Sequence, residues 1–191
     1  MNIVCLLGSP RPKGNSATIA NRFLETAQGM GAKIQTFALN KLSYRGCQAC
    51  MTCKTKLERC VLKDELEPVL DAVRDADILV MASPIYYGDV SAQLKAFVDR
   101  TFSYLTPDFK NDPIPCRLAP GKKLLMILAQ GEPDEKQFAD VFPKYEMFFK
   151  WYGFKDFRLI RACGVMDVKD AGNRNDLMTI AQDTAKQMME S

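Results

Sequence analysis

The chain has 191 residues, of which 47% are hydrophobic and 26% charged, and a net charge of +3. This composition is typical of one soluble globular domain and not of a strongly basic nucleic-acid-binding protein. The absence of histidine excludes catalytic triads, cysteine–histidine proteases and histidine-based zinc enzymes. There is no transmembrane run of about eighteen apolar residues, and no signal peptide at the N-terminus. We therefore expect one cytoplasmic domain over residues 1–191, without membrane or nucleic-acid partners.

Short apolar runs alternate with amphipathic segments along the chain. The apolar runs predict strands, and apolar residues spaced as on one helical face predict helices. We expect strands at 3–8, 33–39, 77–83, 123–129 and 157–165, and helices at 16–27, 66–73, 94–105, 144–152 and 177–188. The alternation predicts an α/β fold with a doubly wound parallel sheet, covered by helices on both faces.

Two stretches interrupt this alternation. Residues 41–63 follow the second predicted strand and contain four cysteines, and residues 106–121 contain four prolines. Long loops in compact domains usually have a function. We expect residues 106–121 to form an ordered loop over the edge of the sheet.

The loop after the first strand has the sequence Gly8-Ser9-Pro10-Arg11-Pro12-Lys13-Gly14-Asn15-Ser16. Ligands of doubly wound sheets bind at the carboxyl ends of the strands, and helix N-termini attract phosphate. We interpret the loop as a phosphate site, with donors from Ser9, Asn15 and Ser16 and a charge-assisted contact from Arg11. The loop is neither a Walker A motif nor a Gly-x-Gly-x-x-Gly fingerprint. The alternative is a polar loop in which an Asn or Ser caps the helix.

The loop after the third strand combines aromatic residues with a glycine. It continues from Ser83 through Pro84, Ile85, Tyr86, Tyr87, Gly88 and Asp89. A flat ring can pack on an aromatic side chain, and glycine allows a backbone to approach closely. We interpret the loop as a site for a heterocycle, with Gln130 and Gly131 as a further wall. The alternative is a turn with two half-buried tyrosines.

These motifs, together with Ser91-Ala92-Gln93-Leu94-Lys95-Ala96-Phe97-Val98-Asp99-Arg100, resemble the NADPH-dependent FMN reductase family. The resemblance implies a flavodoxin-like fold of five parallel strands in the order 2-1-3-4-5. It also implies FMN, with its phosphate on the first loop and its isoalloxazine ring against residues 84–89, near residues 130–131. A homodimer or homotetramer with flavin sites near the interface is implied as well.

Four of the seven cysteines lie within fourteen residues, in the pattern C-x2-C-x2-C-x6-C. They are Cys47, Cys50, Cys53 and Cys60. Cys-x2-Cys-x2-Cys is a spacing of iron–sulfur ligands. Zinc sites more often use two separate Cys-x2-Cys pairs. A zinc site, free thiols and a redox disulfide remain alternatives.

The cysteine-rich stretch is basic. Between residues 41 and 63, six lysines and arginines are opposed only by Glu58. Nearby cations stabilise an anionic thiolate cluster and lower thiol pKa values, although runs of charge are usually solvated loops. The loop is expected near the carboxyl end of the sheet, on the flavin side. Cys5 and Cys163 are predicted in the core.

The cysteine motif resembles that of iron–sulfur flavoproteins, a subfamily that carries FMN and a [4Fe-4S] cluster. The resemblance implies a flavin oxidoreductase in which single electrons from a ferredoxin-type donor pass through the cluster to FMN. NAD(P)H is the other donor that the wider family implies. A basic loop with Lys54, Lys56 and Arg59 suits the docking of an acidic ferredoxin.

Three alternatives remain at this stage. The first is a cluster-free NAD(P)H-dependent FMN or quinone reductase. The second is a flavodoxin-like electron carrier without its own substrate, although such carriers are usually strongly acidic. The third is a zinc-stabilised interaction module. The final electron acceptor does not follow from the sequence.

Overall fold

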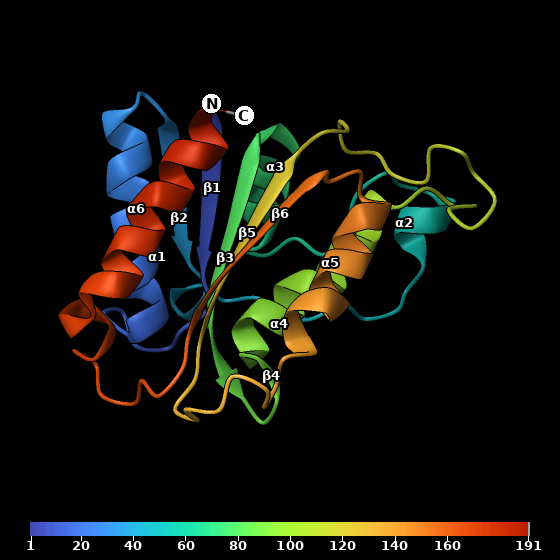
Figure 1. The fold of residues 1–191 in the computed structure, drawn as a ribbon. Helices are drawn as coiled ribbons and strands as arrows, with labels where there is room; N and C mark the ends of the chain where they lie inside the picture. The colour runs from blue at the N-terminus through green and yellow to red at the C-terminus, as the bar shows by residue number, and fades with distance from the viewer. Residues whose placement is uncertain (191) are drawn as a thin grey trace.

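Five parallel strands form the centre of the protein, a computed structural model that describes residues 1–190 (Figure 1). They are β1 (Asn2–Leu7), β2 (Lys33–Ala38), β3 (Ile78–Tyr86), β5 (Lys123–Ala129) and β6 (Asp156–Ala162), in the order β2-β1-β3-β5-β6. This is the order predicted for the parallel strands. The structure adds β4 (Asp89–Val90), which pairs antiparallel with β3.

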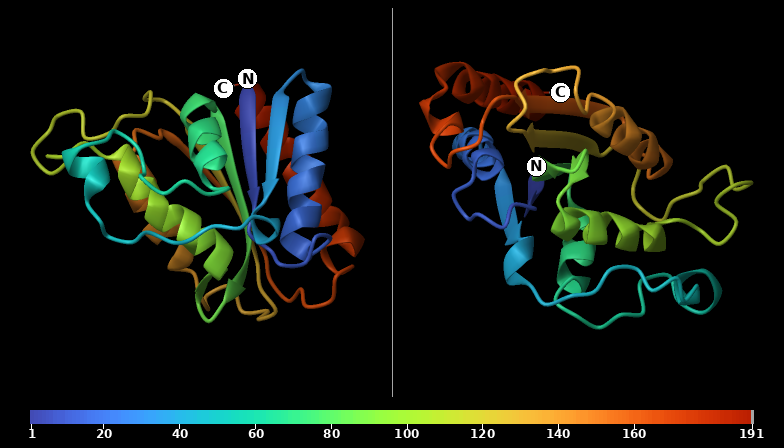
Figure 2. Two further views of the ribbon diagram at one scale, coloured as in Figure 1. Left: turned by 180° about the vertical axis from the view of Figure 1, so that it is seen from behind. Right: turned by 90° about the horizontal axis from the view of Figure 1, so that it is seen from below.

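Helices cover both faces of the sheet, as predicted (Figure 2). The helices α1 (Asn15–Gly29) and α6 (Asn175–Glu190) lie on one face, and α3 (Glu67–Asp75), α4 (Ala92–Arg100) and α5 (Val141–Trp151) lie on the other. Side chains alternate along β1, so that Ile3 and Cys5 enter the core under α1 and α6 while Val4 and Leu6 enter the opposite core. The chain thereby builds two apolar cores, one on each face of the sheet.

The elements outside the regular alternation are short. They are a four-residue helix α2 (Thr52–Thr55) and the 3-10 segments η1 (Leu39–Lys41), η2 (Thr101–Tyr104) and η3 (Ala171–Asn173). The predicted helix over 94–105 is wrong at its end, because α4 stops at Arg100 and η2 follows it. Within η2, the buried hydroxyl of Ser103 donates to the Arg100 carbonyl three residues earlier.

The hairpin between β3 and β4 was not predicted. Its two turn residues, Tyr87 and Gly88, have positive φ angles of 50° and 76°. Positive φ at both central residues is the geometry of a two-residue type I′ hairpin turn. Tyr87 is fully exposed at the turn, so the interpretation of two half-buried tyrosines is wrong for this residue.

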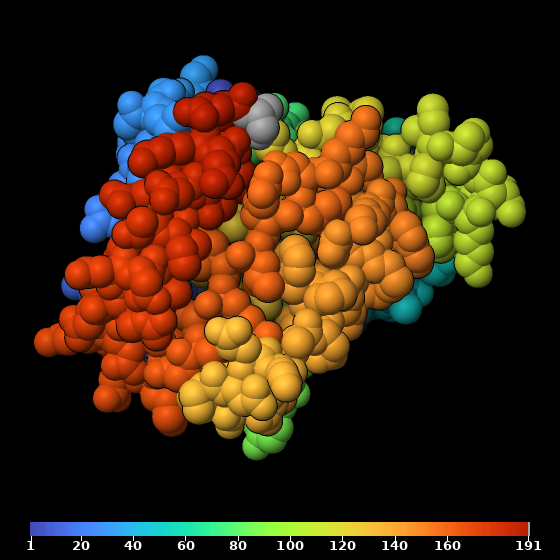
Figure 3. Space-filling view, viewed as in Figure 1, coloured from blue at the N-terminus to red at the C-terminus, as the bar shows by residue number. Residues whose placement is uncertain are grey.

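Residues 106–121 do not lie over the sheet edge. Phe109 packs edge-to-face against Phe102, with ring centroids 5.8 Å apart, and lies beside Trp151 of α5. Figure 3 shows this loop in yellow-green, projecting from the molecule beside the teal atoms of the cysteine-rich segment. Cys5 is buried as predicted, but Cys163 follows the end of β6 and is partly exposed. No helix among the described residues has the length and hydrophobicity needed to cross a bilayer.

Candidate functional site

Hydrogen bonds hold the first and third loops together at the carboxyl ends of β1 and β3. The Ser91 hydroxyl donates to the Gly8 carbonyl at 2.6 Å and accepts from the Leu94 N–H as the N-cap of α4. The Ser91 N–H in turn donates to Oγ of Ser83 at 2.9 Å. A Cβ on Gly8 would lie 2.9 Å from Cβ of Leu94. The close approach of β1 to α4 therefore requires glycine at this position.

The N-terminus of α1 opens into the first loop. Gly14 is its N-cap, and no side chain of the described residues caps this helix end. The side chain of Asn15 points elsewhere, since its Oδ1 accepts from the Ala171 N–H at 3.0 Å. The alternative in which an Asn or Ser side chain caps the first helix is therefore wrong. The uncapped N–H groups and the helix dipole leave a site suited to an anion.

A cavity of about 180 Å³ lies over this helix end, between the loops that follow β1, β3, β5 and β6. Eight of the twelve predicted cofactor residues line it: Ser9, Arg11, Asn15, Ser16, Pro84, Ile85, Tyr86 and Gly131. The remaining lining residues, which the sequence reading missed, are Gly14, Ala129, Val165 and Met166. A Cβ on Gly14 would lie 2.9 Å from Oγ of Ser9, so the loop is folded closely around this residue.

The four other predicted cofactor residues do not line the cavity. Tyr87 and Gly88 form the hairpin turn. Gln130 is buried, and its side chain donates to the carbonyls of Glu132 and Asp134 and accepts from Arg161. It shapes the loop after β5 from within.

Asp89 faces α5 and not the phosphate cavity. Its carboxylate accepts from Nζ of Lys144 at 2.8 Å and from the Tyr145 hydroxyl at 2.7 Å. Burial alone would raise the pKa of Asp89, but these two hydrogen bonds and the charge of Lys144 hold it below its usual value. The ionised carboxylate of Asp89 therefore links the β3–β4 hairpin to α5.

The missed residues Val165 and Met166 belong to the loop after β6. Nη1 of Arg11 donates to the Met166 carbonyl at 3.0 Å, and a Cβ on Gly131 would lie 2.8 Å from Cγ of Met166. This loop thus closes the cavity from the side opposite β3. Its position at the carboxyl end of the last parallel strand was the signal that could have identified it.

The four cysteines of the motif line a second cavity, of about 130 Å³. Cys47 and Cys50 are exposed, and Cys53 and Cys60 are partly buried. Ala49 and Met51 alternate with the cysteines and have left-handed φ angles of 51° and 58°. Within residues 1–190 no three Cys, Asp or Glu side chains converge on a point where one metal ion would bind. The four cysteine residues do share one hollow of the surface, into which the segment 47–53 and Cys60 both face.

Partly buried cations support this cavity. Nζ of Lys54 donates to the carbonyls of Phe102 and Leu105, each at 2.6 Å, and lies 4.1 Å from the Phe102 ring centroid. Arg117 donates to the Cys53 carbonyl at 3.2 Å. The ammonium of Lys54 therefore faces inward and is not available to dock a partner.

The chain also shifts the acidity of the cysteine thiols. Hydrogen bonds from Thr52 lower the pKa of Cys50. Burial raises the pKa of Cys53, and the charge of Lys54 opposes that effect.

Arg100 also lines the cysteine cavity and is 1% exposed. Its Nη1 donates to Oδ2 of Asp64 at 2.8 Å and to the Arg45 carbonyl at 2.9 Å. Its Nε is buried and has no hydrogen-bond partner within residues 1–190. An orphaned donor in a thiol-lined cavity fits an anionic group bound there.

The two cavities have no lining residue in common. Ser91, next to the phosphate cavity, precedes the first turn of α4, whereas Arg100 ends that helix at the cysteine cavity. A helix of this length spans about 12 Å. The expectation that the cysteines lie at the carboxyl edge of the sheet, on the flavin side, is therefore wrong. The loop after β2 runs past that edge and along α4 (Figure 1).

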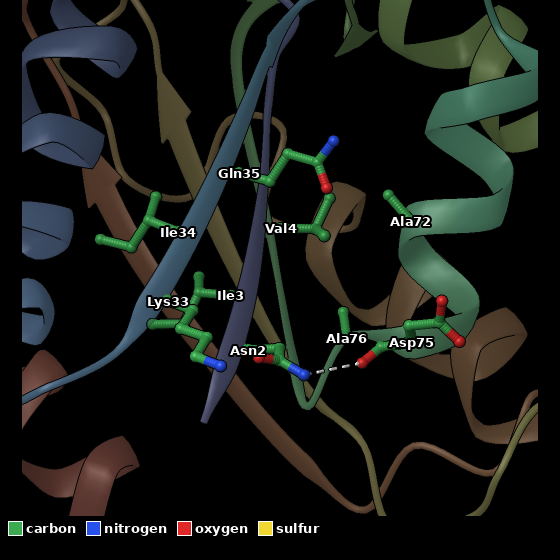
Figure 4. A pocket seen from close by; sticks show the side chains of 9 residues that line it. All are labelled: Asn2, Ile3, Val4, Lys33, Ile34, Gln35, Ala72, Asp75 and Ala76. Carbon is green, nitrogen blue, oxygen red and sulfur yellow. Dashed lines mark hydrogen bonds between the residues drawn. The ribbon is translucent and has the colours of Figure 1, made fainter.

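Two further hollows are present, and the first adjoins the cysteine cavity, with which it shares Cys47 and Phe102. An apolar groove of about 550 Å³ runs between α4, α5 and the 106–121 loop, and includes Asp89, Phe102 and Trp151. Another, of about 420 Å³, lies at the amino ends of β1 and β2, where Nδ2 of Asn2 is 3.5 Å from the Asp75 carbonyl (Figure 4). The second hollow is at the opposite end of the strands from the loops that converge on α1.

Comparison with known proteins identifies the family to which the chain is similar. The family model of NADPH-dependent FMN reductases matches residues 1–128. An iron-sulfur flavoprotein from Archaeoglobus fulgidus is 34% identical over 104 residues, which are 54% of this chain and 47% of the relative. One from Methanosarcina thermophila is 34% identical over 101 residues, or 53% and 52% of the two chains. The chain thus spans about half the length of these curated relatives.

Other similar proteins carry reductase names. An FMN-dependent NADH:quinone oxidoreductase from Photorhabdus laumondii is 27% identical over 148 residues, covering 74% of this chain and 66% of the relative. Among solved structures, an NAD(P)H:quinone oxidoreductase from Methanothermobacter marburgensis has a TM-score of 0.74 at 17% identity, covering 98% and 96% of the chains. An FMN-dependent NADH-azoreductase from Bacillus anthracis, in complex with FMN, has a TM-score of 0.72 at 14% identity, covering 99% and 100%. The structural matches establish the flavodoxin-like fold.

Proposed function

The chain belongs to the NADPH-dependent FMN reductase family, and on that premise we propose that it is an FMN-dependent oxidoreductase that also carries a [4Fe-4S] cluster. Cys47, Cys50, Cys53 and Cys60 are the proposed cluster ligands. The proposed donor is a ferredoxin-type protein that supplies single electrons. We propose that the protein acts as a homodimer or homotetramer.

The observation that carries this proposal is the cavity formed by the cysteine motif. All four cysteine residues line one hollow, and the side chains of Lys54, Arg100 and Arg117 support its walls. A cluster bound by four thiolates is anionic, and nearby cations stabilise it. The names of the relatives from Archaeoglobus and Methanosarcina support the same assignment.

The proposed FMN site is the cavity over α1. The phosphate would be held by Ser9, Arg11, Ser16 and the free N–H groups of the helix, and the ring would lie against the backbone of residues 84–86. When bound, FMN supplies one- and two-electron redox chemistry. The chain itself contributes the anion site, a rigid wall at the end of β3 and a closing loop at Val165 and Met166. Binding and orientation of FMN need no side-chain acid or base, which suits a chain without histidine.

The donor proposal rests on charge. Lys56 and Arg59 are exposed beside the cysteine cavity, and an acidic protein would be attracted to them. Lys54 has no part in this surface because its ammonium is bound by backbone carbonyls.

A cluster-free NAD(P)H-dependent quinone or FMN reductase is the second candidate. The match to the Photorhabdus quinone oxidoreductase favours it, because that match covers more of this chain than the matches to the iron-sulfur flavoproteins. In this case the cysteines would only support the loop. NAD(P)H would then replace the ferredoxin-type donor.

Serine substitution separates the two candidates. Cys53→Ser and Cys60→Ser should each lose most of the bound iron after anaerobic purification while retaining FMN. Cys163→Ser is the matched control, because Cys163 is also partly exposed but lies outside the motif. Equal iron content in all three variants would refute the cluster assignment, whereas loss of FMN in the motif variants would refute two separate sites.

A further inference from the structure

Arg100 is the most deeply buried charge at the cysteine cavity. It is the last residue of α4 and is 1% exposed. Its guanidinium reaches back to the segment after the motif, where Nη1 pairs with Asp64 at 2.8 Å and Nη2 donates to the Leu62 carbonyl at 3.4 Å. An arginine fixed on both sides in this way holds its position without a bound ligand.

The pairing with Asp64 uses Nη1 of Arg100 and does not involve its Nε–H donor. Nε of Arg100 is buried and without a partner among the described residues, although a buried donor normally finds one. An unmade hydrogen bond at a buried site destabilises the fold. Because Arg100 lines the cavity together with the four cysteines, an acceptor bound in that cavity would satisfy this donor.

The neighbours of Arg100 indicate the chemistry of that acceptor. Cys60 lines the same cavity as Arg100, and Asp64 pairs with the guanidinium of Arg100. Asp64 has its own partners, since it also accepts from the N–H groups of Arg45 and Leu66. An acceptor on the cysteine side of the cavity would pair with Nε of Arg100, and a cluster bound by the four cysteines would present sulfur there.

We propose that Arg100 donates a hydrogen bond through Nε to a sulfur of the iron–sulfur cluster, on the Cys60 side, and thereby raises the reduction potential of the cluster. This inference rests on the proposed function. Reduction adds one negative charge to the cluster, so a fixed cation and donor stabilise the reduced form more than the oxidised form. Asp64 has the opposite effect on the potential, because its negative charge disfavours reduction.

The test is a pair of variants measured by redox titration of the purified holoprotein, followed by electron paramagnetic resonance. Arg100→Gln should lower the midpoint potential by at least the equivalent of a tenfold change in the reduction equilibrium, which is about 59 mV for one electron. Asp64→Asn should raise it. Arg100→Lys keeps the charge and loses the Nε donor, so its potential should lie between those of wild type and Arg100→Gln.

Iron and sulfide analysis accompanies each titration. Opposite shifts in Arg100→Gln and Asp64→Asn support the proposal, whereas equal potentials, or shifts in the same direction, would show that the pair only holds the loop and would overturn it. If Arg100→Gln loses its iron, the midpoint potentials of Arg100→Lys and Asp64→Asn are compared instead. Opposite shifts from the wild-type potential again support the proposal, and equal potentials or shifts in the same direction overturn it. Wild-type protein without iron would refute the cluster itself, an outcome that the analysis separates from a wrong role for Arg100.

Discussion

The hydroxyl of Ser91 donates to the carbonyl of Gly8 across 83 positions of sequence, at 2.6 Å. Ser91 is the N-cap of α4 and Gly8 follows β1, so one side chain joins the two loops that frame the proposed FMN site. The same oxygen accepts from the Leu94 N–H. The width of the site therefore depends on a residue that does not line it.

Ser91→Ala removes both hydrogen bonds and leaves the buried Gly8 carbonyl without this donor. We expect the free energy of unfolding to fall by about 1–3 kcal/mol, measured by urea denaturation. Thr26→Ala is the control, because it loses one side-chain hydrogen bond on α1 and should cost less than about 1 kcal/mol. An equal cost in the two variants would contradict the bridging role.

Gly14→Ala should weaken FMN binding at least tenfold, measured by fluorescence titration of the apoprotein. The added methyl would meet Oγ of Ser9 at 2.9 Å and the Arg11 carbonyl at 3.2 Å, which forces the loop off the helix end. Gly29→Ala on the same helix has open space around its Cβ and should bind FMN as wild type does. Unchanged affinity in Gly14→Ala would show that the cofactor does not use this loop.

Arg11→Gln should weaken FMN binding by about 10–100-fold, because a charge-assisted hydrogen bond contributes about 1.5–3 kcal/mol. Riboflavin lacks the phosphate, so its affinity should be the same in variant and wild type. Arg22→Gln, on the solvent side of α1, serves as the control. A parallel loss of FMN and riboflavin binding would assign Arg11 to the ring instead of the phosphate.

Asp89→Asn should make stability less dependent on pH in the acid range. The pKa of Asp89 is lower in the folded protein than its ordinary value near 4. Its contribution is therefore present above pH 4 and is lost as the pH falls below that value. At pH 7 the variant should be less stable by about 1 kcal/mol, and the difference should shrink as the pH falls below 4. Parallel urea midpoints for both proteins from pH 7 to pH 3 would contradict the Asp89–Lys144 pairing.

Lys56→Glu combined with Arg59→Glu should slow reduction by a ferredoxin-type donor at low salt, and less so at high salt. Stopped-flow absorbance provides the rates. Lys33→Glu with Lys186→Glu makes the same change in net charge at exposed positions outside the cysteine segment. Similar rates for the two double variants would place the donor elsewhere.

The predicted strands are confirmed where the sequence contains a continuous apolar run. Apolar runs at 77–83 and 123–129 became β3 and β5, and the strand order followed from the family resemblance. The hairpin at Tyr87 and Gly88 was not predicted because the third strand was expected to end at Ser83. A two-residue turn that contains glycine is nevertheless a known sequence signal for a β-hairpin. The end of α4 was misplaced because Phe102 and Leu105 continue the apolar spacing into the 3-10 segment.

Local sequence indicated which residues form the sites but not how far apart they lie. The cysteine spacing predicted that four thiols wrap one small cluster; the four residues line one cavity, and the cluster itself stays a prediction. The spacing did not show that this cavity lies at the Arg100 end of α4, because that depends on long-range contacts such as Lys54 with Leu105. For the same reason the inward direction of Lys54 was not foreseen, and Gln130 was predicted at the cofactor although its partners lie in its own loop.

The most direct test of the account is anaerobic purification followed by an absorption spectrum and analysis of FMN, iron, sulfide and zinc. The account predicts one FMN with about four iron and four sulfide per chain and no zinc. FMN without iron would contradict the cluster and leave a simple flavin reductase, and protein without FMN, after reconstitution with the free cofactor, would contradict the function as a whole.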